Sequence, residues 1–289
     1  MRAQVGMTMV VAGLAFFAGA CQRPQSVPVA SRSQLSTFVS QDLFRKANRG
    51  REVLQADGRF VVPRGVRRVW IDVGAHHLET TRAELLGYPD LLLIAIEPLA
   101  ECWNEWPASE RLIGLPAAIY LEPGTMDFHV NAYDETSSLA ESVPGSRVAE
   151  LTRTVEVRRV PVVRLLDVLA AIPPELPIAY VKTDVQGVDL QVLQSAGPEL
   201  GRVYRVGAEV ILEEIYRGVA GRAPTTEEQM VSFMASNGFR LGDDRDDWSE
   251  GQAWEGGRGW TDKRFINFRN WRPIDRFLQQ LRFDWSRRG

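Results

Sequence analysis

Two uninterrupted apolar runs mark the first half of the chain. The first begins at Val69 and stops at Asp72-Val73-Gly74-Ala75, and the second, Leu91–Ile96, stops at Glu97-Pro98. Near-continuous apolar runs of this length predict strands that are buried on both faces, as in a parallel sheet. We therefore expect strands at 68–73 and 91–96, joined by a crossover helix at 80–86.

Helical spacing of apolar residues recurs along the rest of the chain. It predicts one or two helices within 36–56 and further helices at 163–171, 188–195 and 225–237. The last of these has clear start signals, because Thr225 or Thr226 is placed to cap it and Glu228 stands near the capping-box position.

Between these helices, the sequence has patterns that are typical of strands. Strands are predicted at 115–120, 125–130, 155–160, 178–183, 203–210, 239–241 and 265–268. Glu122-Pro123-Gly124 is a turn signal, so we expect 115–120 and 125–130 to form a hairpin. Charged residues and Pro161 give 155–160 the pattern of an exposed or edge strand. Strands that alternate with helices indicate an open, mostly parallel α/β sheet.

The ends of the two apolar runs carry the first candidate chemistry. A strand that ends in Asp-x-Gly, followed about 20 to 25 residues later by a strand that ends in an acid, is typical of a nucleoside site in an α/β sheet. Gly74 lacks a Cβ, so the turn it forms can pass close to a ligand. Glu97 is expected to accept hydrogen bonds from two ribose hydroxyls.

Six short motifs in this order resemble the FkbM family of S-adenosylmethionine-dependent methyltransferases. The resemblance spans about residues 61 to 270 and rests on Ile71-Asp72-Val73-Gly74-Ala75, Ile96-Glu97-Pro98, Ser137-Ser138-Leu139, the segment from Val160-Pro161-Val162 to Leu166, Lys182-Thr183-Asp184-Val185-Gln186-Gly187, and Leu193-Gln194-Ser195-Ala196. It implies a class I methyltransferase (Rossmann-like) fold, a mostly parallel seven-stranded sheet whose last strand is antiparallel. It also implies methyl transfer from S-adenosylmethionine, commonly to a hydroxyl oxygen.

The resemblance also implies roles for individual residues. Cofactor contacts are expected from Asp72, Gly74, Ala75, His76, Glu97 and Pro98, catalytic roles from Lys182 and Asp184, and acceptor contacts from Ser137, Ser138, Gln186 and Gly187. Structural roles compete with each of these. Asp72 and Gly74 would also suit a simple strand-to-helix turn, Lys182 and Asp184 a loop-fixing ion pair, and the two serines turn chemistry.

Two positions depart from the family pattern. His76-His77-Leu78-Glu79 stands where the family usually has Asn and then a second glycine, and Gln186 stands where it prefers Glu. Gln keeps the hydrogen-bonding shape of Glu and removes its charge. These departures leave open an alternative function, an exported methyltransferase-like binding module without turnover.

Other chemistries have weaker signals. His76 and His77 are adjacent, His129 is distant, and no cysteine cluster accompanies them, so we expect no metal site. A nicotinamide-dependent oxidoreductase is disfavoured because the first turn has one glycine where the dinucleotide fingerprint wants three. The tryptophans of the Gly-rich segment near the C-terminus favour a packed lid over an aromatic acceptor surface; they are Trp248, Trp254, Trp260 and Trp271.

The N-terminus has the pattern of an export signal. Met1-Arg2 precedes an apolar run from Val5 to Phe17 and the exit Ala18-Gly19-Ala20-Cys21, which resembles a bacterial lipoprotein signal with Cys21 as a lipid anchor. We divide the chain into a signal (1–21), a tether with N-terminal helices (22–60), the methyltransferase domain (61–272) and a basic C-terminal helix or tail (273–289). If the signal is functional, we expect the protein to be exported or anchored to a membrane. If the apolar N-terminus is incidental, we expect the protein to be cytoplasmic.

Composition gives only general information about the binding partners. The 289 residues are 45% hydrophobic, enough for one large core, and the formal net charge is −3. Nucleic-acid binders usually carry a concentrated basic face, so we expect a small-molecule or glycan acceptor and no nucleic acid. The second cysteine, Cys102, is expected to be a buried free thiol.

Overall fold

A computed structural model describes residues 34–242, 253–254, 257–258 and 260–268. The predicted signal, Cys21 and the C-terminal tail lie outside these residues, as do Trp248 and Trp271. Among the described residues, no helix has the length and apolarity needed to cross a bilayer.

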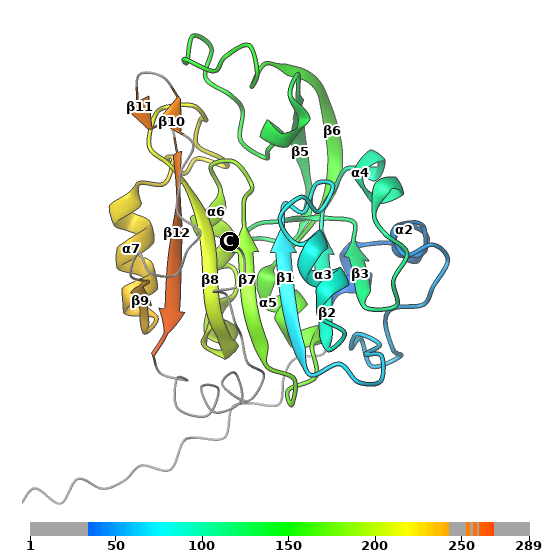
Figure 1. The fold of residues 1–289 in the computed structure, drawn as a ribbon. Coiled ribbons are helices and arrows are strands. Elements are labelled where there is room, and N and C mark those ends of the chain that lie inside the picture. The colour runs from blue at the N-terminus through cyan, green and yellow to red at the C-terminus, as the bar shows by residue number, and fades with distance from the viewer. Residues whose placement is uncertain (1–33, 243–252, 255–256, 259, 269–289) are drawn as a thin grey trace, which may run out of the picture. The chain divides into compact units, whose positions relative to one another are not determined.

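A seven-stranded sheet forms the centre of the fold (Figure 1), with the strand order β3-β2-β1-β7-β8-β12-β9. Its strands are β1 (Arg68–Val73), β2 (Leu91–Ile96), β3 (Leu112–Leu115), β7 (Ile178–Thr183), β8 (Val203–Ile211), β9 (Phe239–Leu241) and β12 (Trp260–Asn267). All neighbours from β3 to β8 pair in parallel, and β12 is antiparallel to both β8 and β9. The expected sheet, with its antiparallel last strand, is confirmed.

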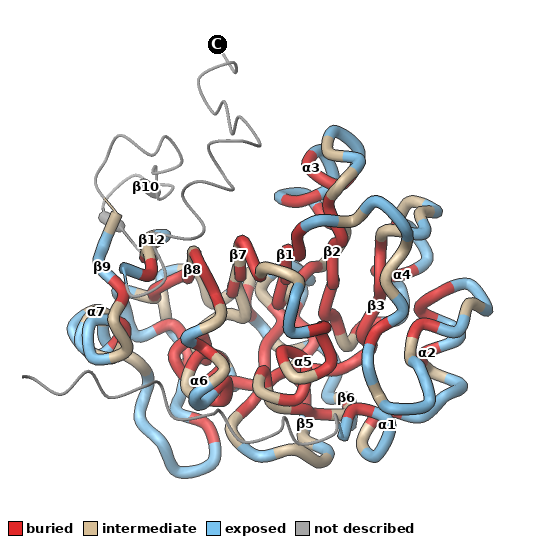
Figure 2. Tube along the Cα trace, turned by 90° about the horizontal axis from the view of Figure 1, so that it is seen from below, coloured by how far each residue is buried: buried red, intermediate tan, exposed pale blue. Residues whose placement is uncertain are grey.

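Helices cover both faces of this sheet and create two buried clusters. On one face, α3 (Arg82–Gly87) and α4 (Ala100–Glu105) pack against side chains such as Trp70 and Leu93. On the other, α5 (Leu165–Ala171), α6 (Asp189–Gln194), α7 (Glu227–Ser236) and α1 (Leu35–Phe38) pack against Ile71, Leu92 and their neighbours. Figure 2 shows buried positions along the central strands, as near-continuous apolar runs require. Cys102 is a buried free thiol, as expected.

A smaller sheet departs from the sequence prediction. The segment 115–120 is not one strand: β3 ends at Leu115, and β4 (Ala118–Ile119) belongs to a separate three-stranded sheet, β4-β6-β5. Pro116 explains the break, because proline cannot donate to a strand ladder. The expected hairpin of 115–120 with 125–130 is also wrong, since β5 (Gly124–Asn131) and β4 both pair with β6 (Thr154–Val163). β6 has exposed positions as predicted, yet it is the central strand of the three.

The β5–β6 arm, residues 124–163, stands over the carboxyl edge of the main sheet (Figure 1). Its connection contains the 3-10 helix η1 (Asp134–Thr136). The remaining short elements are α2 (Gln41–Ala47), η2 (Gly197–Arg202), β10 (Ala253–Trp254) and β11 (Gly257–Arg258).

Helix α7 begins at a capping box that differs in one residue from the prediction. Thr226 accepts a hydrogen bond from the Gln229 amide at 3.2 Å, and the Gln229 side chain accepts one from the Thr226 amide at 3.0 Å. Gln229, not Glu228, is therefore the capping partner, because it stands three residues after the cap.

Replacing Thr226 with alanine is expected to lower the free energy of unfolding by about 1 kcal/mol, the usual cost of losing such a cap. Chemical denaturation measures this change. Ser232→Ala, an exposed substitution within the same helix, is the control and is expected to be neutral or slightly stabilising. A Thr226 variant as stable as wild type would contradict the role of the cap.

Candidate functional site

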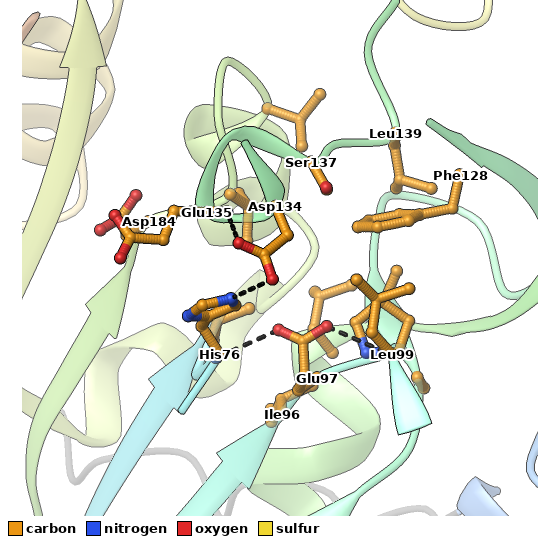
Figure 3. Close-up of a pocket in the computed structure, with 18 residues that line it drawn as sticks. His76, Ile96, Glu97, Leu99, Phe128, Asp134, Glu135, Ser137, Leu139 and Asp184 are labelled. Atoms are coloured by element: carbon orange, nitrogen blue, oxygen red, sulfur yellow. Dashed lines mark hydrogen bonds and ion pairs between the residues drawn. The ribbon is translucent and has the colours of Figure 1, made fainter. Parts of the chain in front are cut away.

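A pocket opens at the carboxyl edge of the sheet, between the ends of β1 and β2 and the β5–β6 arm (Figure 3). It encloses about 530 Å³, counting the part that is open to solvent. Six residues singled out from the sequence line it: Gly74, His76, Glu97, Pro98, Ser137 and Asp184. Open α/β sheets bind ligands at this edge.

Residues to which the sequence analysis assigned no role in the site complete the pocket. Apolar side chains form much of its wall, among them Ile96, Leu99, Ala117, Ile119, Phe128 and Leu139. Asp134 and Glu135 of η1 add two carboxylates. The arm brings Phe128 and Asp134 to the site, and no local sequence signal marked these two residues, whereas Leu139 belongs to the Ser137-Ser138-Leu139 motif.

Glu97 follows β2 and is only 5% exposed. One carboxylate oxygen accepts the His76 amide at 3.1 Å, and the other accepts the Leu99 amide at 2.9 Å. Burial raises the pKa of Glu97 to about 7, although both amides oppose the shift. Each oxygen keeps a second lone pair, so the carboxylate can accept further hydrogen bonds from a ligand.

Gly74 makes the turn after β1 in a left-handed conformation, with φ +76°. A Cβ at this position would overlap the carbonyl oxygen of Asp184, so the close approach of the two loops requires glycine. The amides of Gly74 and Ala75 donate to the Ile96 carbonyl oxygen at 3.0 and 3.1 Å. These two amides therefore bind the end of β2, and the expected contact of Gly74 and Ala75 with the cofactor stays a prediction.

The loop after Ala75 adopts a backbone conformation that glycine would adopt more readily than the residues present. His76 and Leu78 have φ values of 40° and 66°, a region that non-glycine residues rarely adopt. The His76 ring lies between Glu79 at 3.0 Å and Asp134 at 3.4 Å. Burial lowers the pKa of His76, but these two carboxylates outweigh that effect and raise it overall. These contacts hold the His76 ring on the pocket wall and favour its protonated form.

Two groups of side chains within the described residues have spacing that would admit a metal ion. They are His76 with Glu79 and Glu135, and His76 with His77 and Cys102, each with ligand atoms within 4.8 Å. Glu79 and Glu135 are exposed, and the contacts of His76 with Glu79 and Asp134 already account for its position. The absence of a metal site stays a prediction.

Lys182 forms a buried ion-pair cluster beside the pocket. Its ammonium lies 3.2 Å from the Asp72 carboxylate and 3.5 Å from that of Asp184. Burial lowers the pKa of Lys182, but the two carboxylates outweigh burial and raise it well above its ordinary value. Lys182 is therefore a fixed cation at neutral pH, which suits an orienting role and not that of a base.

Asp72 is not among the residues that line the pocket. It is fully buried, and its carboxylate accepts hydrogen bonds from Thr81 at 2.6 Å and Lys182 at 3.2 Å. Asp184, by contrast, is 38% exposed and lines the pocket. Asp72 can therefore influence a ligand only through Lys182 and Asp184, whereas Asp184 can contact the ligand directly.

Three more of the sequence-predicted residues hold the loop that follows β7. The Ser138 hydroxyl lies 2.9 and 2.8 Å from the carbonyl oxygens of Val185 and Gln186. The Gln186 amide donates to Asp184 at 2.9 Å, and its oxygen lies 3.1 Å from the Tyr216 hydroxyl. Gly187 packs against the Tyr216 ring. Ser138 and Gln186 thus fix the arm to this loop, while Ser137 alone of the serine pair lines the pocket.

The strand order and the acid-bearing pocket at the carboxyl edge together define a methyltransferase of the class I, Rossmann-like fold. A family model described as the methyltransferase FkbM domain matches residues 72–241, and the chain belongs to this family. No curated protein shows significant similarity to the chain.

Solved structures with a similar fold are methyltransferases of several kinds. The antibiotic-resistance methyltransferase Kmr is 14% identical, with 71% of this chain and 89% of that chain covered and a TM-score of 0.36. A 16S rRNA (adenine(1408)-N(1))-methyltransferase from Catenulisporales acidiphilia is 11% identical, with 70% and 89% covered and a TM-score of 0.35. The mitomycin 7-O-methyltransferase MmcR is 12% identical, with 70% and 49% covered and a TM-score of 0.35.

One expectation needs correction. The sequence analysis excluded nucleic acid as a partner, and that exclusion does not stand, because 16S rRNA methyltransferases are among the solved structures similar to this chain and the acceptor class is not established. Net charge averages over the whole chain and does not describe a local surface, which is why composition was a poor guide.

Proposed function

We propose that the chain binds S-adenosylmethionine in the pocket beside Glu97 and transfers the methyl group to a hydroxyl oxygen of a small-molecule or glycan acceptor. The observation that carries the proposal is the Glu97 carboxylate, which lies on the pocket wall at the end of β2 between apolar side chains. This is the position from which an acid holds a ribose diol in open α/β sheets.

The residues on the pocket wall fit the parts of this ligand. Glu97 has one free lone pair on each oxygen for the two ribose hydroxyls. Apolar walls that include Ile119 and Phe128 suit a planar adenine. Asp184, at the other side of the pocket, offers a carboxylate to the ammonium group. S-adenosylmethionine itself supplies the reactive methyl group on a positively charged sulfur.

Calorimetry on the full chain tests the proposal. We expect saturable, one-to-one binding of S-adenosylmethionine and of S-adenosylhomocysteine, which shares the adenosine and amino-acid ends. Absence of detectable binding of either compound would remove the basis for the assignment.

Binding is expected to weaken in acid. Because burial raises the pKa of Glu97 to about 7, a proton occupies the carboxylate below that pH and competes with the ribose hydroxyls. If the ionised form alone binds, affinity falls by up to about tenfold for each pH unit below 7 and is constant above it.

Calorimetry between pH 5.5 and 8.5 measures this dependence, and Glu97→Gln is expected to remove it. His76 is a second titratable group on the pocket wall, and Glu79 and Asp134 raise its pKa. His76→Asn is therefore the control, and asparagine tolerates the left-handed backbone at this position. A pH dependence that survives in Glu97→Gln and disappears in His76→Asn would assign it to the histidine instead.

A further inference from the structure

A second pocket lies on the far side of the loop that follows β7. It encloses about 360 Å³, counting the part that is open to solvent, and its wall includes Gly187, Asp189, Glu209, Tyr216, Thr225 and Met230. The loop from Asp184 to Asp189 contributes to both pockets, because Asp184, Val185 and Val188 line the first. The two pockets therefore share one wall.

Two buried carboxylates face this second pocket. Glu209, near the end of β8, is 6% exposed, and Asp189, at the start of α6, is 2% exposed. The Thr183 hydroxyl and the Val185 amide hold the Asp189 carboxylate, whereas within the described part of the chain Glu209 Oε2 accepts no hydrogen bond. Buried polar atoms are nearly always paired, so this Glu209 oxygen indicates a hydrogen-bonding partner from outside the chain.

Burial and neighbouring carboxylates raise the pKa of both acids in this pair. Burial raises the pKa of Asp189 to about 7, and the Asp184 carboxylate adds to the shift. Burial also raises the pKa of Glu209, with further contributions from Asp184, Asp189 and Asp262 and an opposing one from Lys182. A pKa near the operating pH, as for Asp189, suits a group that exchanges a proton with its partner.

The order of the strands relates this pair to the donor site. Glu97 follows β2 and Asp184 follows β7, so a donor held between them has its adenosine end over β2 and its amino-acid end toward β7. The next strand in the sheet is β8, which carries Glu209. An acceptor that approaches the amino-acid end from the β8 side would enter through the second pocket.

We propose that the second pocket receives the acceptor, and that Glu209, paired with Asp189, binds the acceptor hydroxyl and takes its proton. This assignment rests on the proposed function, in which the first pocket holds S-adenosylmethionine. In the transfer, the acceptor oxygen forms a bond to the methyl carbon, and the carbon–sulfur bond breaks with its electron pair going to sulfur. The hydroxyl proton passes to the Glu209 carboxylate, so charge and atoms balance.

A test that needs no known acceptor uses two donor analogues. Sinefungin carries a cationic amine on a carbon that replaces the methyl-bearing sulfur, whereas S-adenosylhomocysteine carries nothing at that place. If the carboxylate pair faces the transferred group, the amine forms charge-assisted hydrogen bonds with it. We expect calorimetry on the full chain to give sinefungin about tenfold or more higher affinity than S-adenosylhomocysteine.

Substitutions assign this preference to the pair. In Glu209→Gln and Asp189→Asn, the ratio of the two affinities is expected to fall toward one while the affinity for S-adenosylhomocysteine stays within about twofold of wild type. Glu199→Gln is the control, because Glu199 is also largely buried but lies in η2, before the start of β8, where it pairs with Arg202 at 2.9 Å. Asp189→Asn provides an independent measurement should Glu209→Gln fail to fold.

The outcomes separate the two proposals. A preference for sinefungin that survives both substitutions, or no preference in wild type, overturns the role of Glu209 and Asp189 while the donor site stands. Failure of wild type to bind either analogue overturns the donor site, and the acceptor assignment with it.

Discussion

Replacing Gly74 with alanine is expected to lower the free energy of unfolding by about 3 to 5 kcal/mol and to abolish binding of S-adenosylmethionine. The left-handed backbone of Gly74 disfavours any side chain, and a methyl group would overlap the Asp184 carbonyl oxygen. Relief of that overlap requires the ends of β1 and β7 to separate. Because Gly74 and Asp184 both line the first pocket, the same movement deforms the ligand site.

Thermal and chemical denaturation, followed by calorimetry on the folded fraction, measure both effects. Gly87→Ala is a matched control, because Gly87 ends α3 and a Cβ there would meet no atom within 4 Å. We expect that control to be neutral or stabilising by up to about 1 kcal/mol. A Gly74 variant with wild-type stability would show that the two loops are not in contact as described.

Replacing Glu97 with alanine is expected to weaken binding of S-adenosylmethionine by about 100-fold or more. Hydrogen bonds to a charged acceptor contribute about 1.5 to 3 kcal/mol each, and two ribose hydroxyls lose theirs. The substitution also leaves the amides of His76 and Leu99 without their acceptor, so the loop that carries His76 loses its anchor.

Glu97→Gln separates these contributions. The amide keeps the size of the side chain but has one accepting oxygen, so we expect an affinity between those of wild type and the alanine variant. Glu101→Gln, an exposed substitution on α4, is the control for loss of a nearby charge. Calorimetry with unchanged affinity in Glu97→Ala would refute the donor site.

The centre of the main sheet was predictable because β1, β2, β7 and β8 are nearly continuous apolar runs, whereas the edge strand β3 was missed and β12 was predicted only from residue 265. Ile71, Leu93, Val181 and Val206 are fully buried, and burial on both faces leaves a strong local signal. The β4-β6-β5 sheet was not predictable, because β5 pairs with a strand about thirty residues further along the chain. In addition, Pro116 interrupts the run that seemed to be one strand. Helix α4 is short, and its six residues gave no periodic pattern.

The site residues also differ in whether the sequence could predict them. Gly74, Glu97 and Asp184 were predictable because residues that directly follow parallel strands meet at one edge of the sheet. Asp72 is one residue earlier than the strand end, and its side chain is buried under Thr81 and Lys182. The unpaired Glu209 oxygen depends on what surrounds it in space, so no pattern of neighbours along the chain could indicate it.

The loop between Asp184 and Gly187 is held by residues of two different origins. Ser138 comes from the arm and Tyr216 from the segment after β8, and both contact Gln186. The wall that the two pockets share is therefore held from outside the main sheet, by the arm and by the segment after β8, so a change in either of these contacts would alter both pockets together.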